Sequence, residues 1–192
     1  MSLTFISQAQ LPTEFGSFQV HVFDYNGQEH LALVMGSLSE SDVILTRIHS
    51  ECLTGDGLFS LRCDCGPQLA HAMQAIQDKG QGVLIYLRQE GRGIGLTEKI
   101  KAYQLQDQGM DTFDANIKLG HAADSRDYGM LKDVFDHLNV KQVDLMTNNP
   151  DKIDALESQG ISVHKRIPLQ VGHNPHNKRY IDTKKSRFKH LD

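Results

Sequence analysis

The run GVLIYLRQ at residues 82–89 constrains the fold of this chain more than any other segment. Its continuous apolar character indicates a buried strand. The glycine-rich turn EGRGIGL follows directly at residues 90–96, and residues 97–109 then have the pattern of a helix that ends at Gly109. A buried strand, a glycine-rich turn and a helix in this order predict an α/β fold whose turn exposes backbone N–H groups.

Two other regions extend this alternation of strands and helices. Near the N-terminus, alternating apolar residues flank Asn26-Gly27, a pair typical of a two-residue hairpin turn. Near the C-terminus, residues 142–169 have the pattern of a βαβ unit. We therefore predict a mixed α/β (α+β) fold, in which N-terminal antiparallel strands and later βαβ units form mixed sheets with flanking helices. With 192 residues, the chain is expected to be a single domain over residues 1–192.

Polar side chains gather at the end of another predicted strand, DVILTRIHSE at residues 42–51. Alternate residues of a strand share one face, so Arg47, His49 and Glu51 are expected to project together. A cation, an imidazole and a carboxylate at the end of a strand indicate a site rather than an ordinary surface.

All three cysteines lie within fourteen residues, as Cys52, Cys63 and Cys65. Their spacing favours a zinc ion held by three thiolates over three buried apolar side chains or an incomplete disulfide framework. Structural zinc sites have four protein ligands, whereas catalytic sites have three and leave the fourth position to water. Because His49 or His71 could supply a fourth ligand, the sequence leaves open which kind of site this is.

Two strand-to-helix junctions have features of anion binding. The glycine-rich turn matches neither the dinucleotide-binding nor the P-loop fingerprint, but Arg88 and Arg92 flank its first glycine. The second junction, TNNP, places Thr147 and Lys152 near a predicted helix N-terminus. Both junctions are therefore candidate phosphate sites.

Composition narrows the classes of function. At 39% hydrophobic and 23% charged residues, the chain has the composition of a soluble globular protein. No apolar run approaches the roughly 20 residues needed to cross a bilayer, and no secretory signal is found at the N-terminus. The net charge of −4 weighs against polynucleotides and anionic membranes, and the basic tail at residues 174–192 is interpreted as a solvated end. We therefore expect a cytoplasmic protein with neither nucleic acid nor a membrane as a partner.

Six motifs occur in one order over nearly the whole chain: RIHSECLTGD, SLRCDCG, RQEGRGIGL, YQLQDQGMDT, AADSRDY and LMTNNPDKI. In these motifs the chain resembles GTP cyclohydrolase II in its stand-alone form. The resemblance implies a homodimer that binds GTP, with one Zn²⁺ per subunit and Mg²⁺ on the GTP phosphates. It implies hydrolysis of GTP to 2,5-diamino-6-ribosylamino-4(3H)-pyrimidinone 5′-phosphate, formate and pyrophosphate, the first step of riboflavin biosynthesis.

The resemblance also assigns roles to individual residues. It implies that Cys52, Cys63 and Cys65 bind zinc with water as the fourth ligand, and that Tyr103 donates or relays a proton. The GTP contacts that it implies are Arg47, Ile48, His49, Ser50, Glu51, Gln68, Glu90, Gly91, Arg92, Thr112, Thr147 and Lys152.

The loop ADSRD carries the remaining catalytic pair. Taken alone, Asp124 and Arg126 fit a helix-capping carboxylate and a surface arginine. The resemblance implies instead that Arg126 is the nucleophile on the α-phosphorus, with Asp124 as its proton acceptor. Since arginine is protonated in proteins, stabilisation of charge is the alternative role. One departure from the family lies in the tail, where relatives tend to read Gly-His-Leu and this chain reads Lys189-His190-Leu191; this leaves the conformation of the tail open.

Two other functions fit parts of the sequence. A zinc-braced nucleic-acid-binding module fits the Cys-x-Cys pair and the basic tail, and it requires a fourth protein ligand. Another zinc enzyme acting on a nucleobase fits the triplet His49-Ser50-Glu51, which matches only the first half of the zinc deaminase signature.

Overall fold

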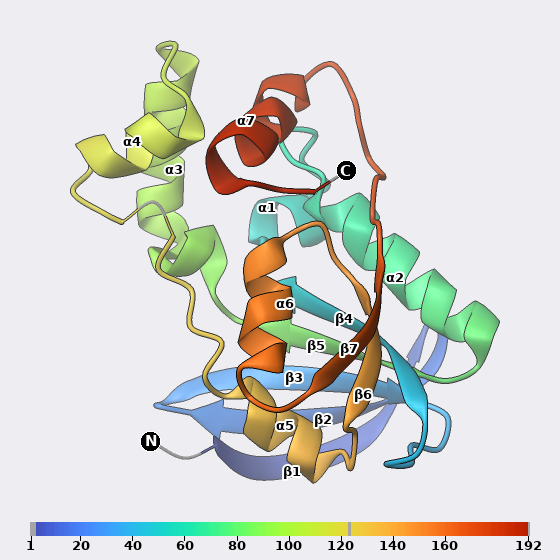
Figure 1. Ribbon diagram of the computed structural model, residues 1–192. Coiled ribbons are helices and arrows are strands. Elements are labelled where there is room, and N and C mark those ends of the chain that lie inside the picture. The colour runs from blue at the N-terminus through green and yellow to red at the C-terminus, as the bar shows by residue number, and fades with distance from the viewer. Residues whose placement is uncertain (1–2, 123, 192) are drawn as a thin grey trace.

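The computed structural model describes residues 3–122 and 124–191, and the described strands form one seven-stranded mixed sheet with helices on its faces (Figure 1). The strand order is β1-β2-β3-β5-β4-β6-β7. The strands are β1 (Leu3–Thr13), β2 (Gly16–Tyr25), β3 (Gln28–Met35), β4 (Val43–Ser50), β5 (Gly82–Leu87), β6 (Gln142–Met146) and β7 (Ser162–Ile167). The predicted mixed α/β class is confirmed, with one sheet in place of several.

The described helices connect these strands or follow them. They are α1 (Leu53–Asp56), α2 (Cys65–Lys79), the 3₁₀ turn η1 (Glu90–Gly93), α3 (Gly95–Asp107), α4 (Thr112–Lys118), α5 (Leu131–His137), α6 (Pro150–Glu157) and α7 (Lys178–Phe188).

The N-terminal half of the sheet is antiparallel, as predicted. Strands β2 and β3 pair through a two-residue turn in which Asn26 and Gly27 have φ of 57° and 76°. Both residues are left-handed, as a type I′ turn requires. Strand β1 pairs with β2 at the edge of the sheet. It was not predicted because most of its side chains are exposed, so its apolar residues have no clean period of two.

The other half of the sheet is parallel and positions the site. Strands β5, β4, β6 and β7 all run in one direction, so their carboxyl ends meet along one edge. The chain passes from β4 through α2 to β5 on one side of β4, and later reaches β6 on the other side. Such a reversal of strand order opens a crevice at the carboxyl ends of the strands.

Two hydrophobic clusters hold the helices against the two faces of the sheet. One includes Leu131, Val134 and Phe135 of α5 together with Leu156 of α6. The other includes Ala72, Met73 and Ile76 of α2. Within the described residues, no helix combines the length and the apolar character needed to span a membrane.

The basic tail differs from its interpretation as a solvated end. Residues 178–188 form α7, which lies beside α1 and the start of α2, over the carboxyl ends of the parallel strands (Figure 1). Its Lys184 is buried, at 9% relative exposure. The physical reason is long-range: Lys184 pairs with Asp64 at 2.5 Å, a partner 120 residues away in the chain.

Candidate active site

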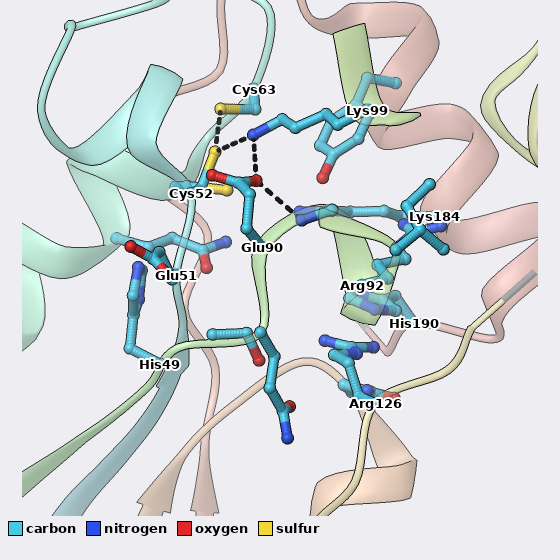
Figure 2. Close-up of a pocket in the computed structure, with 18 of the residues that line it drawn as sticks. His49, Glu51, Cys52, Cys63, Glu90, Arg92, Lys99, Arg126, Lys184 and His190 are labelled. Carbon is cyan, nitrogen blue, oxygen red and sulfur yellow. Dashed lines mark hydrogen bonds and ion pairs between the residues drawn. The ribbon is translucent and has the colours of Figure 1, made fainter. Parts of the chain in front are cut away.

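A cavity opens at the carboxyl ends of β4, β5 and β6, where the predicted site segments converge (Figure 2). The three cysteines line one part of it, from the segment around α1 and the start of α2. Arg92, Arg126, Lys184 and His190 lie together in another part, and they come from three separate segments of the chain.

The three cysteines form a compact sulfur cluster. Their sulfur atoms lie within 4.8 Å of one another, and the Sγ atoms of Cys52 and Cys63 are 3.6 Å apart. Thiolates bound tetrahedrally at about 2.3 Å from zinc are separated by roughly 3.8 Å, so the spacing fits that ion. Gly55 completes the fit, because a Cβ at this position would lie 2.7 Å from the Sγ of Cys63. Among the described residues, the cluster contains no histidine or carboxylate as a fourth member.

Both histidines that could have closed the cluster lie elsewhere. The Nε2 atom of His49 is 3.0 and 3.1 Å from the two carboxylate oxygens of Asp56. His71 is exposed on α2 and does not belong to the sulfur cluster. The three-cysteine set that the sequence predicted is therefore the set that the structure brings together.

Lys99 lies at the cavity between the sulfur cluster and a carboxylate (Figure 2). Its Nζ donates to Cys52 Sγ at 3.0 Å and to Glu90 Oε1 at 2.7 Å. Hydrogen bonds from the Cys63 and Cys65 thiols, together with the Lys99 ammonium, hold the pKa of Cys52 well below its usual range. A thiolate is the form of cysteine that binds metal.

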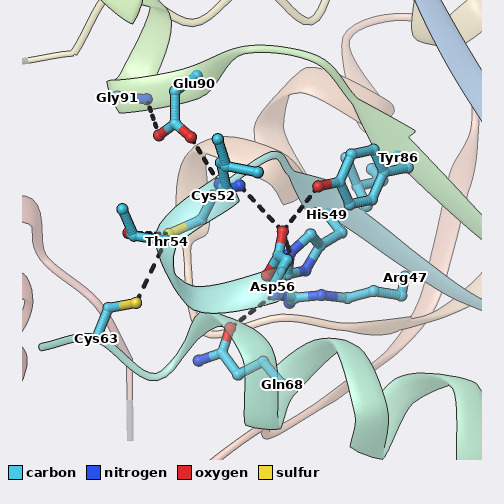
Figure 3. A network of polar contacts seen from close by, with 12 residues as sticks. Arg47, His49, Cys52, Thr54, Asp56, Cys63, Gln68, Tyr86, Glu90 and Gly91 are labelled. Carbon is cyan, nitrogen blue, oxygen red and sulfur yellow. Dashed lines mark hydrogen bonds and ion pairs between the residues drawn. The ribbon is translucent and has the colours of Figure 1, made fainter. Parts of the chain in front are cut away.

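The end of β4 carries the predicted polar face (Figure 3). Arg47 is buried, and it donates to Met146 O at 2.9 Å and to Gln68 Oε1 at 2.7 Å. His49 stacks on Tyr86, with ring centroids 5.4 Å apart. Burial lowers the pKa of His49, which favours the neutral imidazole.

Asp56 connects this face to the sulfur cluster. Its carboxylate accepts hydrogen bonds from Tyr86 OH at 2.8 Å and from Cys52 N at 3.0 Å, and it also contacts His49 (Figure 3). Asp56 is the last residue of α1, which begins directly after Cys52. This network therefore fixes the position of α1 and, with it, the position of Cys52.

The glycine-rich turn is tightly wound. Gly91 and Arg92 both have left-handed backbones, with φ of 63° and 61°. The turn brings Glu90 back over the sulfur cluster, where its Oε2 accepts from Leu53 N at 2.6 Å and its Oε1 from Gly91 N at 2.7 Å. The Arg92 guanidinium lies 3.7 Å from the ring centre of Phe188, a residue of α7.

The TNNP junction has the capped helix start that the sequence predicted. Asn149 accepts from Asp151 N at 3.1 Å, and Pro150 begins α6. Lys152 is buried, and its Nζ donates to Ile48 O at 2.8 Å. Burial, followed by the cations Arg47 and Arg126, lowers the pKa of Lys152 well below its usual range.

Arg126 and Asp124 form a bidentate pair in the loop before α5. Arg126 Nε is 2.9 and 3.1 Å from the two carboxylate oxygens, and Nη2 also donates to Asp124. Burial acts to lower the pKa of Arg126, but the hydrogen bonds to Asp124 outweigh burial with the help of other nearby groups, and the pKa is raised. Arg126 is therefore held in its protonated form.

Several buried donors at the cavity have no acceptor within the described part of the chain. They are Arg47 Nε, Arg92 Nη1 and Asn149 Nδ2. Buried donors of native proteins are nearly always paired, with protein, water or a ligand. Three of them on one cavity indicate a ligand rich in acceptor oxygens.

The comparisons with known proteins agree with this geometry. The family model of GTP cyclohydrolase II matches residues 4–168. A GTP cyclohydrolase-2 from Neisseria meningitidis serogroup C (strain ATCC 700532 / DSM 15464 / FAM18) is 55% identical over 98% of this chain and 96% of its own length. One from Azotobacter vinelandii is 55% identical over 100% of this chain and 93% of its own. The chain belongs to the GTP cyclohydrolase II family. A two-domain 3,4-dihydroxy-2-butanone 4-phosphate synthase from A. baumannii aligns with a TM-score of 0.45 and 20% identity, over 89% of this chain and 41% of that one, which is too distant to bear on function.

As a GTP cyclohydrolase II, the protein gathers most of its sequence-predicted residues around one cavity. Those that line it are Arg47, His49, Ser50, Glu51, Cys52, Cys63, Cys65, Gln68, Glu90, Gly91, Arg92, Tyr103, Arg126, Thr147 and Lys152. Ile48 differs, since its side chain lies fully in the core and only its carbonyl faces Lys152. Asp124 is not among the residues that line the cavity, and it is linked to them by its pair with Arg126. The side chain of Thr112 lies outside the described part of the structure.

Sequence reasoning did not single out four other residues of this GTP cyclohydrolase II site: Asp56, Lys99, Lys184 and His190. Lys99 had a usable signal, because it lies four residues before Tyr103 and so shares its helix face. Asp56, Lys184 and His190 had none, since their partners are brought to them by folding alone.

Proposed function

We propose that the protein is a zinc-dependent enzyme that hydrolyses GTP to 2,5-diamino-6-ribosylamino-4(3H)-pyrimidinone 5′-phosphate, formate and pyrophosphate, the first step of riboflavin biosynthesis. One observation carries the proposal. A cluster of three thiols, with no fourth ligand among the described residues, borders the same cavity as a group of cations and unpaired donors. A metal site with three protein ligands is typical of catalysis, and cations suit a triphosphate.

The sulfur cluster supports the zinc half of the reaction. Cys52, Cys63 and Cys65 would hold the ion, which when bound lowers the pKa of a water molecule and supplies a nucleophile for C8 of guanine. Tyr103 lines the same cavity, with its hydroxyl 3.5 Å from Thr54 Oγ1. Burial raises the pKa of Tyr103, so its hydroxyl stays protonated and able to donate. We assign to it the transfer of a proton during ring opening.

The cations support the phosphate half. Arg92 and Lys152, with Mg²⁺ on the phosphates, would bind the triphosphate while pyrophosphate leaves. Of the two roles open to Arg126, the structure favours stabilisation of charge, because the bidentate pair with Asp124 raises the pKa of the guanidinium. A nucleophile would have to lose that proton.

The guanine half of GTP is assigned to the end of β4 and to its neighbours. Glu51 and Gln68 line the cavity near the sulfur cluster, and Gln68 is fixed by its bonds to Arg47 and Asp64. A carboxylate and an amide are suited to the donor and acceptor edge of guanine. We propose that they orient the base so that C8 faces the three cysteines that would hold zinc.

The two alternative functions receive less support. A zinc brace requires a fourth protein ligand, and the described residues offer none at the cluster. A zinc deaminase would use His49 as a metal ligand, whereas here His49 is bound to Asp56.

We further propose that the enzyme is a cytoplasmic homodimer, as the family resemblance implies. All three cysteines are free thiols, and a reducing compartment keeps them available for metal. Light scattering coupled to size-exclusion chromatography tests the dimer, and a monomer at micromolar concentration would contradict it.

The function is tested by incubating zinc-loaded protein with GTP and Mg²⁺ and assaying formate and pyrophosphate. Release of both products is expected, and failure to release either one from zinc-loaded, folded protein would refute the proposal. Arg126→Ala separates the two roles of Arg126. A loss of roughly 10²–10³-fold in pyrophosphate release supports charge stabilisation, whereas complete loss supports the nucleophile. Lys132→Ala, which removes an exposed cation in the following helix, is the control.

A further inference from the structure

The C-terminal helix α7 is bound to the segments that form the cavity. Asn177, at its N-terminal end, is fully buried and donates to Cys63 O at 3.2 Å. Lys184 then pairs with Asp64, which lies between two of the cysteines. These contacts fix α7 to the cysteine segment at two points, the N-terminal end of the helix and a position about two turns further along.

The end of α7 is bound to the two phosphate-site junctions. Phe188 stacks against Arg92 of the glycine-rich turn. Three residues later, Leu191 N donates to Asn148 O of the TNNP junction at 2.8 Å. His190, between these contacts, is thereby held at the cavity, and His190 N donates back to Lys184 O at 3.1 Å.

The chain bends sharply to place His190. Lys189 has a left-handed backbone with φ of 54°, the conformation that glycine usually adopts after a helix. Lys189 stands where relatives tend to have glycine, and it adopts the same left-handed turn that a glycine would adopt there. This conformation is unfavourable for a residue with a Cβ, so surrounding contacts must hold Lys189 in it.

The imidazole of His190 faces cations from every element around it. Lys184 of α7, Arg92 of the glycine-rich turn, Arg126 of the loop before α5 and Lys152 of α6 all act on it. Burial and these four cations lower its pKa to about 3. A partly exposed imidazole that lines the cavity among four cations indicates a space whose electrostatics favour an anion.

We propose that α7 completes the polyphosphate subsite of the cavity, with His190 as a direct ligand of a phosphate oxygen and Lys184 as the positioning residue that fixes α7 to Asp64. This proposal rests on the proposed function for the identity of the nucleotide as GTP. That the ligand is a polyphosphate is argued separately, from the cations that line this part of the cavity. The helix lies beyond residues 4–168, the part of the chain matched by the family model.

The test is calorimetric titration of the zinc-loaded full-length protein, at constant Mg²⁺, with inorganic triphosphate and separately with guanosine. The variants are His190→Ala, Lys184→Met and Lys184→Arg. Lys178→Met is the matched control, because it removes an exposed lysine from the first turn of the same helix. Far-UV circular dichroism confirms that each variant is folded.

We expect His190→Ala to weaken triphosphate binding by about tenfold to a hundredfold, the loss of one charge-assisted hydrogen bond, with guanosine affinity unchanged. Lys184→Met should weaken triphosphate binding in the same way, and Lys184→Arg should restore most of it. Lys178→Met should bind both ligands like the wild type.

Two results would overturn the proposal: triphosphate affinity unchanged in His190→Ala, or an equal loss of guanosine affinity, which would mean general damage to the site. Failure of the proposed function is a separate outcome. In that case the wild-type protein would release neither formate nor pyrophosphate from GTP, whatever the variants show with inorganic triphosphate.

Discussion

Replacing Lys99 by methionine tests the link between the sulfur cluster and the glycine-rich turn. The side chains of Lys99 and Glu90 are each 10% exposed, and their charged atoms are 2.7 Å apart. Removing one partner of a buried ion pair costs about 3–5 kcal/mol, because the other charge is left uncompensated. Glu90 keeps two backbone donors, Leu53 N and Gly91 N, which offset part of that cost. We therefore expect a loss of about 3 kcal/mol in the free energy of unfolding.

The measurement is thermal or urea unfolding of chelator-treated protein at pH 7.5, so that metal release does not contribute. For a domain of this size, about 3 kcal/mol corresponds to a fall in Tm of roughly 6–12 °C. The pH is chosen from the pKa of Lys99. Burial lowers this pKa, but the Cys52 thiolate, Tyr103 and the bond to Glu90 together outweigh burial, and the net shift is upward. A raised lysine pKa means that the stabilisation is full below the unfolded value and is lost only at higher pH.

Lys101→Met is the matched control on the same helix. Lys101 pairs with Glu98 at 2.7 Å, but its side chain is 55% exposed, and exposed pairs contribute about 0–1 kcal/mol. If Lys99→Met destabilises the protein no more than Lys101→Met does, the view that Lys99 connects the cluster to the turn is wrong.

Cys65→Ser should lower the zinc content, measured by atomic absorption, and abolish formate release; full formate release by zinc-free protein would contradict the metal role. His30→Gln should make stability less sensitive to acid. Burial lowers the pKa of His30, so folding excludes a proton, and wild-type stability falls below about pH 6.5 by up to about 1.4 kcal/mol per pH unit; parallel stability curves for wild type and variant from pH 7.5 to 5.5 would refute this. Lys189→Gly should raise the unfolding free energy by about 0.5–1 kcal/mol, because glycine adopts the left-handed turn without strain. A loss of stability would show that the Lys189 side chain matters more than its backbone.

The sequence alone determined the elements whose side chains are patterned by burial within a single segment. The apolar run 82–89 became β5, and alternation at residues 43–50 became β4. The helix predicted at residues 97–109 became α3, Gly95–Asp107. Periodicity records which face of a segment is buried, and that is local information.

The sequence also determined the residues of the candidate metal site, because three cysteines within fourteen residues could reach one another through short connections. It could not decide between three ligands and four. That depended on whether His49 bonds to the cluster or to Asp56, and Asp56 is placed by α1 and Tyr86 rather than by any local pattern.

The tertiary structure alone decided the role of the tail. Lys184 and His190 lie in a polar segment whose composition resembles a solvated end. Their positions depend on partners more than forty residues away in sequence, Asp64 and Asn148 among them. A charged side chain carries no periodic signal of its own burial. Such a side chain is buried only where folding supplies an opposite charge, as Asp64 does for Lys184.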